Sequence, residues 1–206
     1  MKITKLSNRA ILIEFPTRKE MNLTCFRMSE FSEGNPQLQM YYTPDVFIDI
    51  WSTKKGNIKY WSYWEGHNIP ASKIHMFMHT FAGNVSEREN AVFEAIQEID
   101  YDGYVIFVEQ GDAITIKHEK THFYYREHPE YLKRANEISD KIGLNNIAAM
   151  NKGLLKEGYV KSNLQNERVA YLTAYDQEEF DEMFPKVADV SKVVAELNEL
   201  YNEYDK

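Results

Sequence analysis

Residues 104–125 read YVIFVEQGDAITIKHEKTHFYY, and they predict a strand that leads directly into a helix. The strand, Tyr104 to Glu109, is rich in β-branched and aromatic residues and is the strongest strand pattern in the chain. Gly111 and Asp112 then break the pattern, and Asp112 is a suitable residue to cap the helix that follows.

The helical part of this stretch contains H-E-x-x-H, formed by His118, Glu119 and His122. Residues four apart on a helix lie one above the other, with roughly 5–6 Å between their Cβ atoms, so both histidines can bind one metal ion. Glu119 is turned about 100° from His118, which places its carboxylate where it can act as general base toward a metal-bound water. The alternative interpretation is a surface helix that carries two unrelated histidines.

Apolar residues and lysines around the motif lie on different faces of the predicted helix. On a helical wheel, apolar residues such as Ile114, Ile116 and Phe123 border the histidines, whereas Lys117 and Lys120 point away from them. The lysines predict that the back of this helix is exposed to solvent.

The segment resembles the active-site helix of the zincin metallopeptidases. Thr115, three residues before His118, matches the longer zincin pattern, whereas Lys120 departs from it because zincins have uncharged residues inside the motif. The resemblance implies a zinc ion, peptide-bond hydrolysis and a sheet whose edge strand holds the substrate. Whether residues 104–109 form such an edge strand does not follow from the sequence.

A catalytic zinc needs a third protein ligand, and Glu167 is the best candidate. It falls between Tyr171 and Ala174 on the apolar side of a predicted helix, where a carboxylate is costly unless it is paired or bound to a metal. An ion pair with a lysine or arginine is the alternative role for Glu167. Other carboxylates and imidazoles remain as reserve ligands, namely His128, Glu130 and Glu157.

The second helix resembles that of the gluzincin branch, in which a glutamate in an N-E context completes the metal site. The resemblance covers about 30 residues in the two helices together. Tyr171 lies one turn beyond Glu167, so its hydroxyl could stabilise an oxyanion, although a packing role is equally open. More loosely, the order of the motifs is similar to that of small uncharacterised bacterial H-E-x-x-H proteins.

Other candidate residues fit structural roles better. His75 and His79 are also four apart, but no glutamate follows His75, so we interpret them as structural. His67 lies in a predicted loop over residues 64–70 and is a weaker candidate for the metal. Cys25 is the single cysteine, so the chain forms no internal disulfide, and a small buried residue is the simplest interpretation.

Composition narrows the class of protein. The chain has 206 residues, 43% hydrophobic and 14% aromatic, which predicts a globular protein. A net charge of −8 without an evident basic patch argues against nucleic acid as a partner. The N-terminal residues lack the apolar core of a signal peptide, and no stretch approaches 18 apolar residues, so we expect a cytoplasmic protein that does not enter a membrane.

The remaining patterns predict mostly helices. Strands are expected at residues 9–15 and 58–64, and capping boxes at 86–89 and 162–165, where helices should begin. Further helices are expected at residues 17–33, 44–53, 72–80, 129–142, 145–157 and 187–204. The helix at residues 187–204 carries an apolar seam. Such a seam more often packs on its own domain than on a second copy of the chain, so a homodimer contact is the minority interpretation.

These observations predict an α+β fold, a helix-rich single domain over residues 1–206 with a small sheet and a zincin-like active-site helix. The predicted function is that of a zinc-dependent hydrolase, most simply a peptidase acting on a peptide or protein. His118, His122 and Glu167 would bind Zn²⁺, with Glu119 as general base and Tyr171 as a second catalytic residue. The alternatives are a non-enzymatic binding protein on a degenerate zincin-like scaffold and a metal hydrolase that attacks a non-peptide bond.

Overall fold

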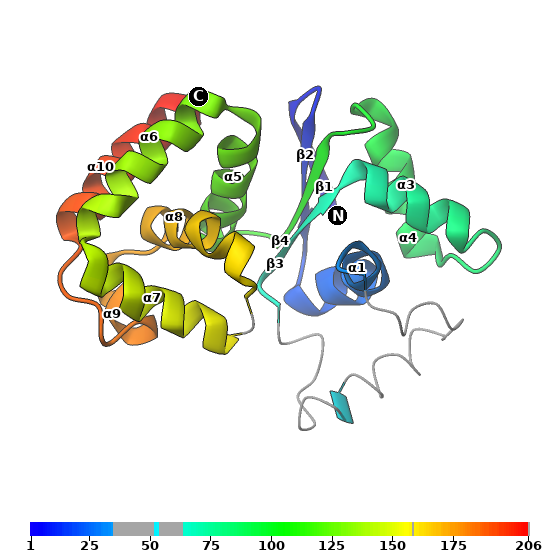
Figure 1. The fold of residues 1–206 in the computed structure, drawn as a ribbon. Coiled ribbons are helices and arrows are strands. Elements are labelled where there is room, and N and C mark those ends of the chain that lie inside the picture. The colour runs from blue at the N-terminus through cyan, green and yellow to red at the C-terminus, as the bar shows by residue number, and fades with distance from the viewer. Residues whose placement is uncertain (35–51, 54–63, 158, 206) are drawn as a thin grey trace. The chain divides into compact units, whose positions relative to one another are not determined.

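The computed structural model describes residues 1–34, 52–53, 64–157 and 159–205. The chain divides into two compact units, Met1–Asp112 and Ala113–Lys206, and each is described by itself (Figure 1). The first unit contains a four-stranded sheet, and the second is helical in its described residues. The helix-rich α+β class is confirmed, while the assignment of one domain stays a prediction.

The first unit is built on a mixed sheet with the strand order β1-β2-β4-β3. β1 (Lys2–Ser7) and β2 (Ala10–Phe15) form an antiparallel pair, β2 runs parallel to β4 (Tyr104–Glu109), and β3 (Gly66–Pro70) runs antiparallel to β4. β4 is therefore an interior strand. Residues 104–109 are hydrogen-bonded on both sides and are not the free edge that a zincin offers to its substrate.

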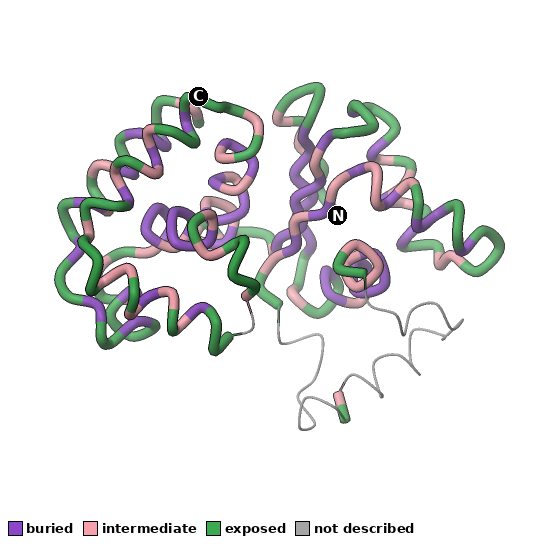
Figure 2. The backbone as a smooth tube through the Cα atoms, viewed as in Figure 1, coloured by how far each residue is buried: buried purple, intermediate pink, exposed green. Residues whose placement is uncertain are grey.

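Helices of the first unit cover one face of this sheet (Figure 1). They are α1 (Arg18–Ser32), α3 (Ala71–Thr80) and α4 (Glu87–Ala95), the last followed by a 3₁₀ turn at Ile96–Glu98. Alternate residues of the strands, including Ile13 and Phe107, pack with Met21 and Phe77 of the helices in one apolar core. β2 is buried along its whole length and β4 at its four central residues, and Figure 2 shows buried residues on the strands and on the helices.

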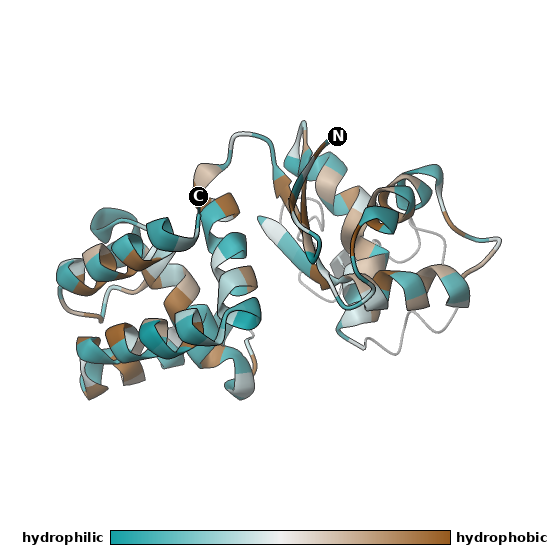
Figure 3. Cartoon of the chain, turned by 90° about the horizontal axis from the view of Figure 1, so that it is seen from above, coloured by the Kyte–Doolittle hydropathy of each residue, from teal (hydrophilic) through white to brown (hydrophobic). Residues whose placement is uncertain are grey.

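The second unit is a set of amphipathic helices. They are α5 (Ala113–Glu127), α6 (Pro129–Ser139), α7 (Leu144–Glu157), α8 (Leu164–Ala174), α9 (Gln177–Met183) and α10 (Ser191–Tyr204), with 3₁₀ turns at Asp140–Ile142 and Lys161–Asn163. α8 packs against α5, α6, α7 and α10. Figure 3 shows hydrophilic and hydrophobic residues on different faces of these helices, as packing requires.

Most predicted elements are confirmed where the structure describes them. The strand at 9–15 is β2, and the helix at 17–33 is α1, in which Thr17 Oγ1 accepts a hydrogen bond from the Glu20 amide. The capping box at Ser86 and Glu89 forms as expected. The predicted helix at 44–53 and strand at 58–64 lie mostly outside the described residues.

Two local predictions are wrong, and two elements were not predicted. Residues 66–70, expected as a loop, form β3 because they pair with β4, even though Gly66, Asn68 and Pro70 have low strand propensity. The capping box at 162–165 is absent, since Ser162 Oγ donates to the Asn163 side chain and α8 begins at Leu164 without a side-chain cap. β1 and α9, with its own capping box at Asp176 and Glu179, were not predicted.

The solvent-exposed back of α5 is also a wrong prediction. Lys120 Nζ lies 2.5 Å from Asp205 Oδ1, and its side chain is only 15% exposed. Lys117 Nζ donates to Asn198 of α10 and lies 5.5 Å from the centre of the Tyr201 ring. The lysine face is therefore covered by the C-terminal segment, which neutralises Lys120. The apolar seam of α10 meanwhile packs on α6 and α8.

No helix in the described part of the chain is both long and apolar enough to cross a membrane.

Candidate metal centre

α5 presents the two histidines of H-E-x-x-H on one face. Gly111, with φ of 84°, makes the turn between β4 and α5 in a backbone conformation that residues with a side chain rarely adopt. The spacing of four then brings the Nε2 atoms of His118 and His122 to 3.1 Å from each other. The imidazoles therefore converge, as the sequence predicted.

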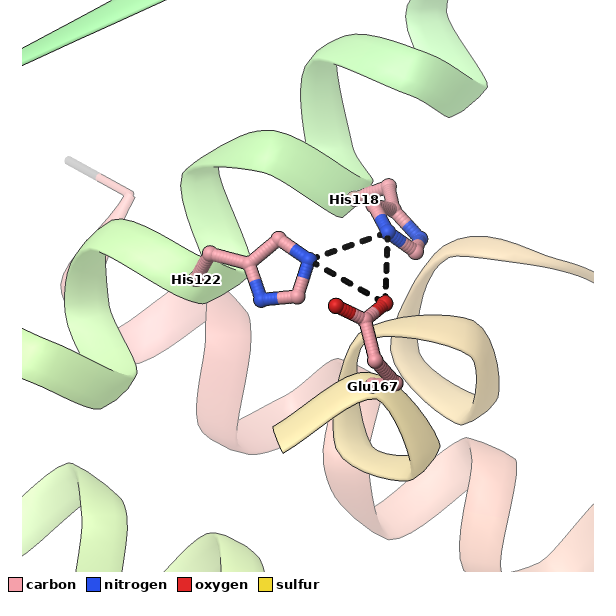
Figure 4. A group of neighbouring side chains, drawn as sticks. All are labelled: His118, His122 and Glu167. Carbon is pink, nitrogen blue, oxygen red and sulfur yellow. Dashed lines mark hydrogen bonds and ion pairs between the residues drawn. The ribbon is translucent and has the colours of Figure 1, made fainter. Parts of the chain in front are cut away.

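α8 supplies the third group. Glu167 Oε2 lies 3.6 Å from His118 Nε2 and 3.5 Å from His122 Nε2 (Figure 4). The three side chains come from two helices that pack directly against each other. Within the described residues, this is the group of histidine and carboxylate side chains placed to hold a metal ion.

The distances between the three atoms fit a metal ion. The point equidistant from atoms separated by 3.1, 3.5 and 3.6 Å lies about 2.0 Å from each of them. Divalent metals bind imidazole nitrogen and carboxylate oxygen at roughly 2.0–2.2 Å. The cluster could therefore accept a small divalent ion with little movement of its side chains.

Burial and neighbouring charges shift the pKa values of Glu167 and His122 in opposite directions. Burial by itself would raise the pKa of Glu167, but the adjacent histidines outweigh it, and the pKa lies well below its usual range. Burial would likewise lower the pKa of His122, but the Glu167 carboxylate outweighs it and raises that pKa. The cluster thus keeps Glu167 as a carboxylate, the form that binds a cation.

A hydrogen bond outside the triad orients His122. Its Nδ1 lies 3.0 Å from the Asn166 side-chain oxygen, so Nδ1–H is the donor and Nε2 is directed toward Glu167. Metal-binding histidines are commonly fixed in this way through their second nitrogen. Asn166 was present in the N-E pattern, but the sequence alone did not assign it this role.

Glu119 and Tyr171 belong to the same neighbourhood. Glu119 is 8% exposed, and its charge contributes to raising the pKa values of His122 and Tyr159. The Tyr171 ring packs edge-on against His118, with 4.9 Å between the ring centres. The structure therefore gathers all five predicted site residues in one region of the second unit.

Two further tyrosines in this region were not predicted from the sequence. The Tyr159 hydroxyl lies 3.2 Å from the Tyr171 hydroxyl, and the Tyr175 ring stacks on Tyr171. Burial, followed by the Glu167 charge, raises the pKa of Tyr159, so its phenol stays protonated. Tyr175 could have been found from its spacing of four from Tyr171, whereas Tyr159 follows α7 outside any helix and gave no pattern.

The other candidate ligands lie elsewhere. His75 packs against the rings of Phe93 and Tyr101, and His79 is exposed, in line with structural roles. The reserve ligands are all exposed, namely His128, Glu130 and Glu157. Cys25 is buried in the core of the first unit, as expected.

His67 is part of the hydrogen-bonded interior of the first unit. Its Nε2 lies 2.7 Å from Asn22 Oδ1 and its Nδ1 lies 3.2 Å from Ser29 Oγ. The Asn22 amide nitrogen donates to the Trp64 carbonyl, which fixes Oδ1 as the acceptor for His67. Burial lowers the pKa of His67 to about 4. The imidazole is therefore neutral in the folded protein at neutral pH.

We expect His67 to make stability depend on pH. The unfolded chain binds a proton at His67 below its ordinary pKa of about 6.5, while the folded chain resists protonation down to about 4. The free energy of unfolding should therefore fall by roughly 3 kcal/mol between pH 6.5 and pH 4. Urea unfolding of the wild type and His67→Gln across this range measures the effect, and parallel pH profiles for the two proteins would contradict it.

Searches against family models, curated proteins and solved structures found no match to this chain. The class that the fold and the site define is therefore a helix-rich α+β protein with a His₂Glu cluster on two packed helices.

Proposed function

We propose that this protein is a zinc-dependent hydrolase, most simply a peptidase. The observation that carries the proposal is the convergence of His118, His122 and Glu167 on a point about 2.0 Å from each ligand atom, the distance zinc prefers to nitrogen and oxygen. Two histidines, one carboxylate and an open position form the ligand set of many catalytic zinc sites.

Each residue has a role in this proposal. His118, His122 and Glu167 hold the zinc, which when bound would supply a water activated for attack at neutral pH. Glu119, next to His118 on α5, takes the proton of the attacking water and passes it to the leaving group. The Tyr171 hydroxyl, beside His118, donates to the oxyanion that develops on the substrate.

A second candidate is a non-enzymatic binding protein that keeps a metal site. The burial of the three ligands favours it, since their side chains are each only 11% exposed. So does the interior position of β4, which leaves residues 104–109 without the free edge of a zincin. Hydrolysis of a non-peptide bond is a third candidate, because an activated water attacks other electrophiles as well.

The cellular setting is part of the proposal. We place the protein in the cytoplasm, with a peptide or protein substrate and no nucleic-acid partner, given a net charge of −8 and one cysteine. A homodimer through the C-terminal helix remains the minor alternative to a monomer.

Metal content tests the proposal directly. Elemental analysis of protein purified without chelators should give about one zinc per chain. His118→Ala and Glu167→Ala should each lose most of it, because each removes one of three ligands. His79→Ala, which removes an exposed histidine of the first unit, is the matched control and should keep the metal. Absence of metal in the wild type even after zinc is added would refute the metal site.

A further inference from the structure

The second unit contains an open cavity of about 430 Å³ at the amino-terminal ends of two helices. Gly143 and Leu144 line it where α7 begins, and Leu164 lines it where α8 begins. Helix amino termini carry partial positive charge and favour anions. The side chains in the cavity wall specify what kind of anion fits.

Arg168 lines the cavity, and only one of the two nitrogens on one edge of its guanidinium group has a hydrogen-bond partner in the described part of the chain. The residue is 4% exposed and lines the cavity, and its Nη2 donates to Asp140 Oδ1 at 2.7 Å. Its Nε is buried and has no hydrogen-bond partner among the residues described. Nε and Nη2 form one edge of the guanidinium, which matches both oxygens of a carboxylate. Asp140 therefore uses only half of an edge that can bind a carboxylate through two hydrogen bonds.

A ligand could displace Asp140 from its hydrogen bond with Arg168. Its side chain is 55% exposed, so it can turn into solvent without leaving a buried charge. Arg168, by contrast, is held inside the unit and would be left unpaired unless another anion took the place of Asp140. A ligand carboxylate that contacts both nitrogens would be the better partner.

Two other features of the wall define the rest of the ligand. Asn151, from α7, also lines the cavity, and its Oδ1 is buried without a hydrogen-bond partner in the described part of the chain. An unused acceptor therefore lies beside the cavity as well as an unused donor. Leu144 is 83% exposed and lies in the wall, which is costly for an apolar side chain in water. Lys161 adds an exposed positive charge at the rim.

We infer that this cavity binds the carboxylate end of an N-acylated amino acid with an apolar side chain. The carboxylate binds Nε and Nη2 of Arg168, the amide N–H donates to Asn151 Oδ1, and the side chain packs on Leu144. A free N-acyl amino acid and the last residue of a peptide share this chemistry. The inference is independent of the proposed hydrolase function, since the cavity wall contains none of the metal-centre residues.

Calorimetric titration of the full chain with N-acetyl-leucine, and with N-acetyl-leucinamide as the uncharged counterpart, tests the ligand class. The amide lacks the charged oxygens that Arg168 recognises, so it should bind at least ten times more weakly than the acid. Equal affinity for the two compounds, or binding of neither the acid nor a peptide with a free C-terminus, would overturn the inference.

Two variants, each of which changes one charge in the cavity wall, test whether the ligand binds in this cavity. Asp140→Asn removes the competing carboxylate and should tighten binding of N-acetyl-leucine several-fold. Asn151→Asp places a negative charge beside the ligand carboxylate and should weaken binding about ten-fold. Asn202→Asp, an exposed site on α10 outside the cavity wall, is the matched control and should have no effect. Asparagine keeps a side-chain oxygen that can accept from Arg168 Nη2, so the guanidinium does not lose its hydrogen-bond partner and the variant should fold. An unchanged affinity in that variant would place the ligand elsewhere.

The two sources of the ligand are distinguished with peptides. A peptide ending in leucine with a free C-terminus, compared with its amidated form, is titrated into the Glu119→Gln chain so that hydrolysis cannot consume it. Tight binding of the free-acid peptide assigns the cavity to peptide C-termini, whereas binding of N-acetyl-leucine alone assigns it to a small metabolite. Failure of the hydrolase proposal would leave these binding results unchanged.

Discussion

Glu119→Gln should abolish most hydrolysis while leaving the metal in place. Glutamine has nearly the same shape but cannot accept the proton of the attacking water, and a general base contributes roughly 10²- to 10⁴-fold to a rate. Glu119 is not one of the three converging ligands, so metal binding has no reason to change. We therefore expect kcat on a susceptible peptide to fall by at least about 100-fold, with zinc still near one per chain.

The readout combines a peptide-library assay with elemental analysis on the same preparation. Glu130→Gln, an exposed glutamate on α6, is the matched control and should retain wild-type activity and metal. Full activity in Glu119→Gln would remove Glu119 from the mechanism. A wild-type protein that binds zinc but cleaves no peptide in a diverse library would favour the binding-protein alternative.

Glu89→Ala should destabilise the first unit by about 3–5 kcal/mol. Glu89 is 2% exposed and lies 3.4 Å from Arg27 Nη1, and Arg27 is itself almost fully buried. Its carboxylate also accepts hydrogen bonds from the Ser86 amide and hydroxyl at the start of α4. Removing it leaves a buried guanidinium without its counter-charge. It also removes the carboxylate half of the capping box, while the Ser86 hydroxyl still accepts from the backbone amide at position 89.

Chemical unfolding measures this loss, and Glu87→Ala is the matched control. Glu87 lies in the first turn of the same helix but is exposed, so its removal should change the free energy of unfolding by less than about 1 kcal/mol. Replacing both Arg27 and Glu89 by methionine should recover part of the stability, because no buried charge then remains unpaired. Equal stability of the Glu89→Ala and Glu87→Ala proteins would contradict this account.

The candidate site was largely predictable from the sequence because its main signals are local. A spacing of four on one helix is sufficient to bring His118 and His122 together. Glu167 was found because a carboxylate on an apolar helical stripe requires a partner. Tyr159 was missed because its approach to Tyr171 depends on where the segment after α7 lies, which no periodicity encodes.

The helices and strands also divide into those that local sequence patterns predict and those that depend on contacts between distant residues. β2, α1 and β4 follow from runs of apolar residues, capping residues and turn residues that act over a few positions. β3 does not follow from such local patterns, because Gly66, Asn68 and Pro70 form a strand only through pairing with β4. The lysine face of α5 was misjudged for a related reason: only the folded chain places Asp205 next to Lys120.

The sequence by itself therefore determined the helix that carries H-E-x-x-H, the carboxylate that lies close to its two histidines and the helix-rich α+β class. These features depend on short-range periodicity and on the cost of burying charge. The tertiary structure decided that β4 is an interior strand and that two residues of α10 and Asp205 beyond it contact the lysines of α5. It also decided that Arg168 lines a cavity while its Nε has no hydrogen-bond partner in the described part of the chain. These features depend on contacts between residues distant in the chain, and only packing of the complete elements brings such residues together.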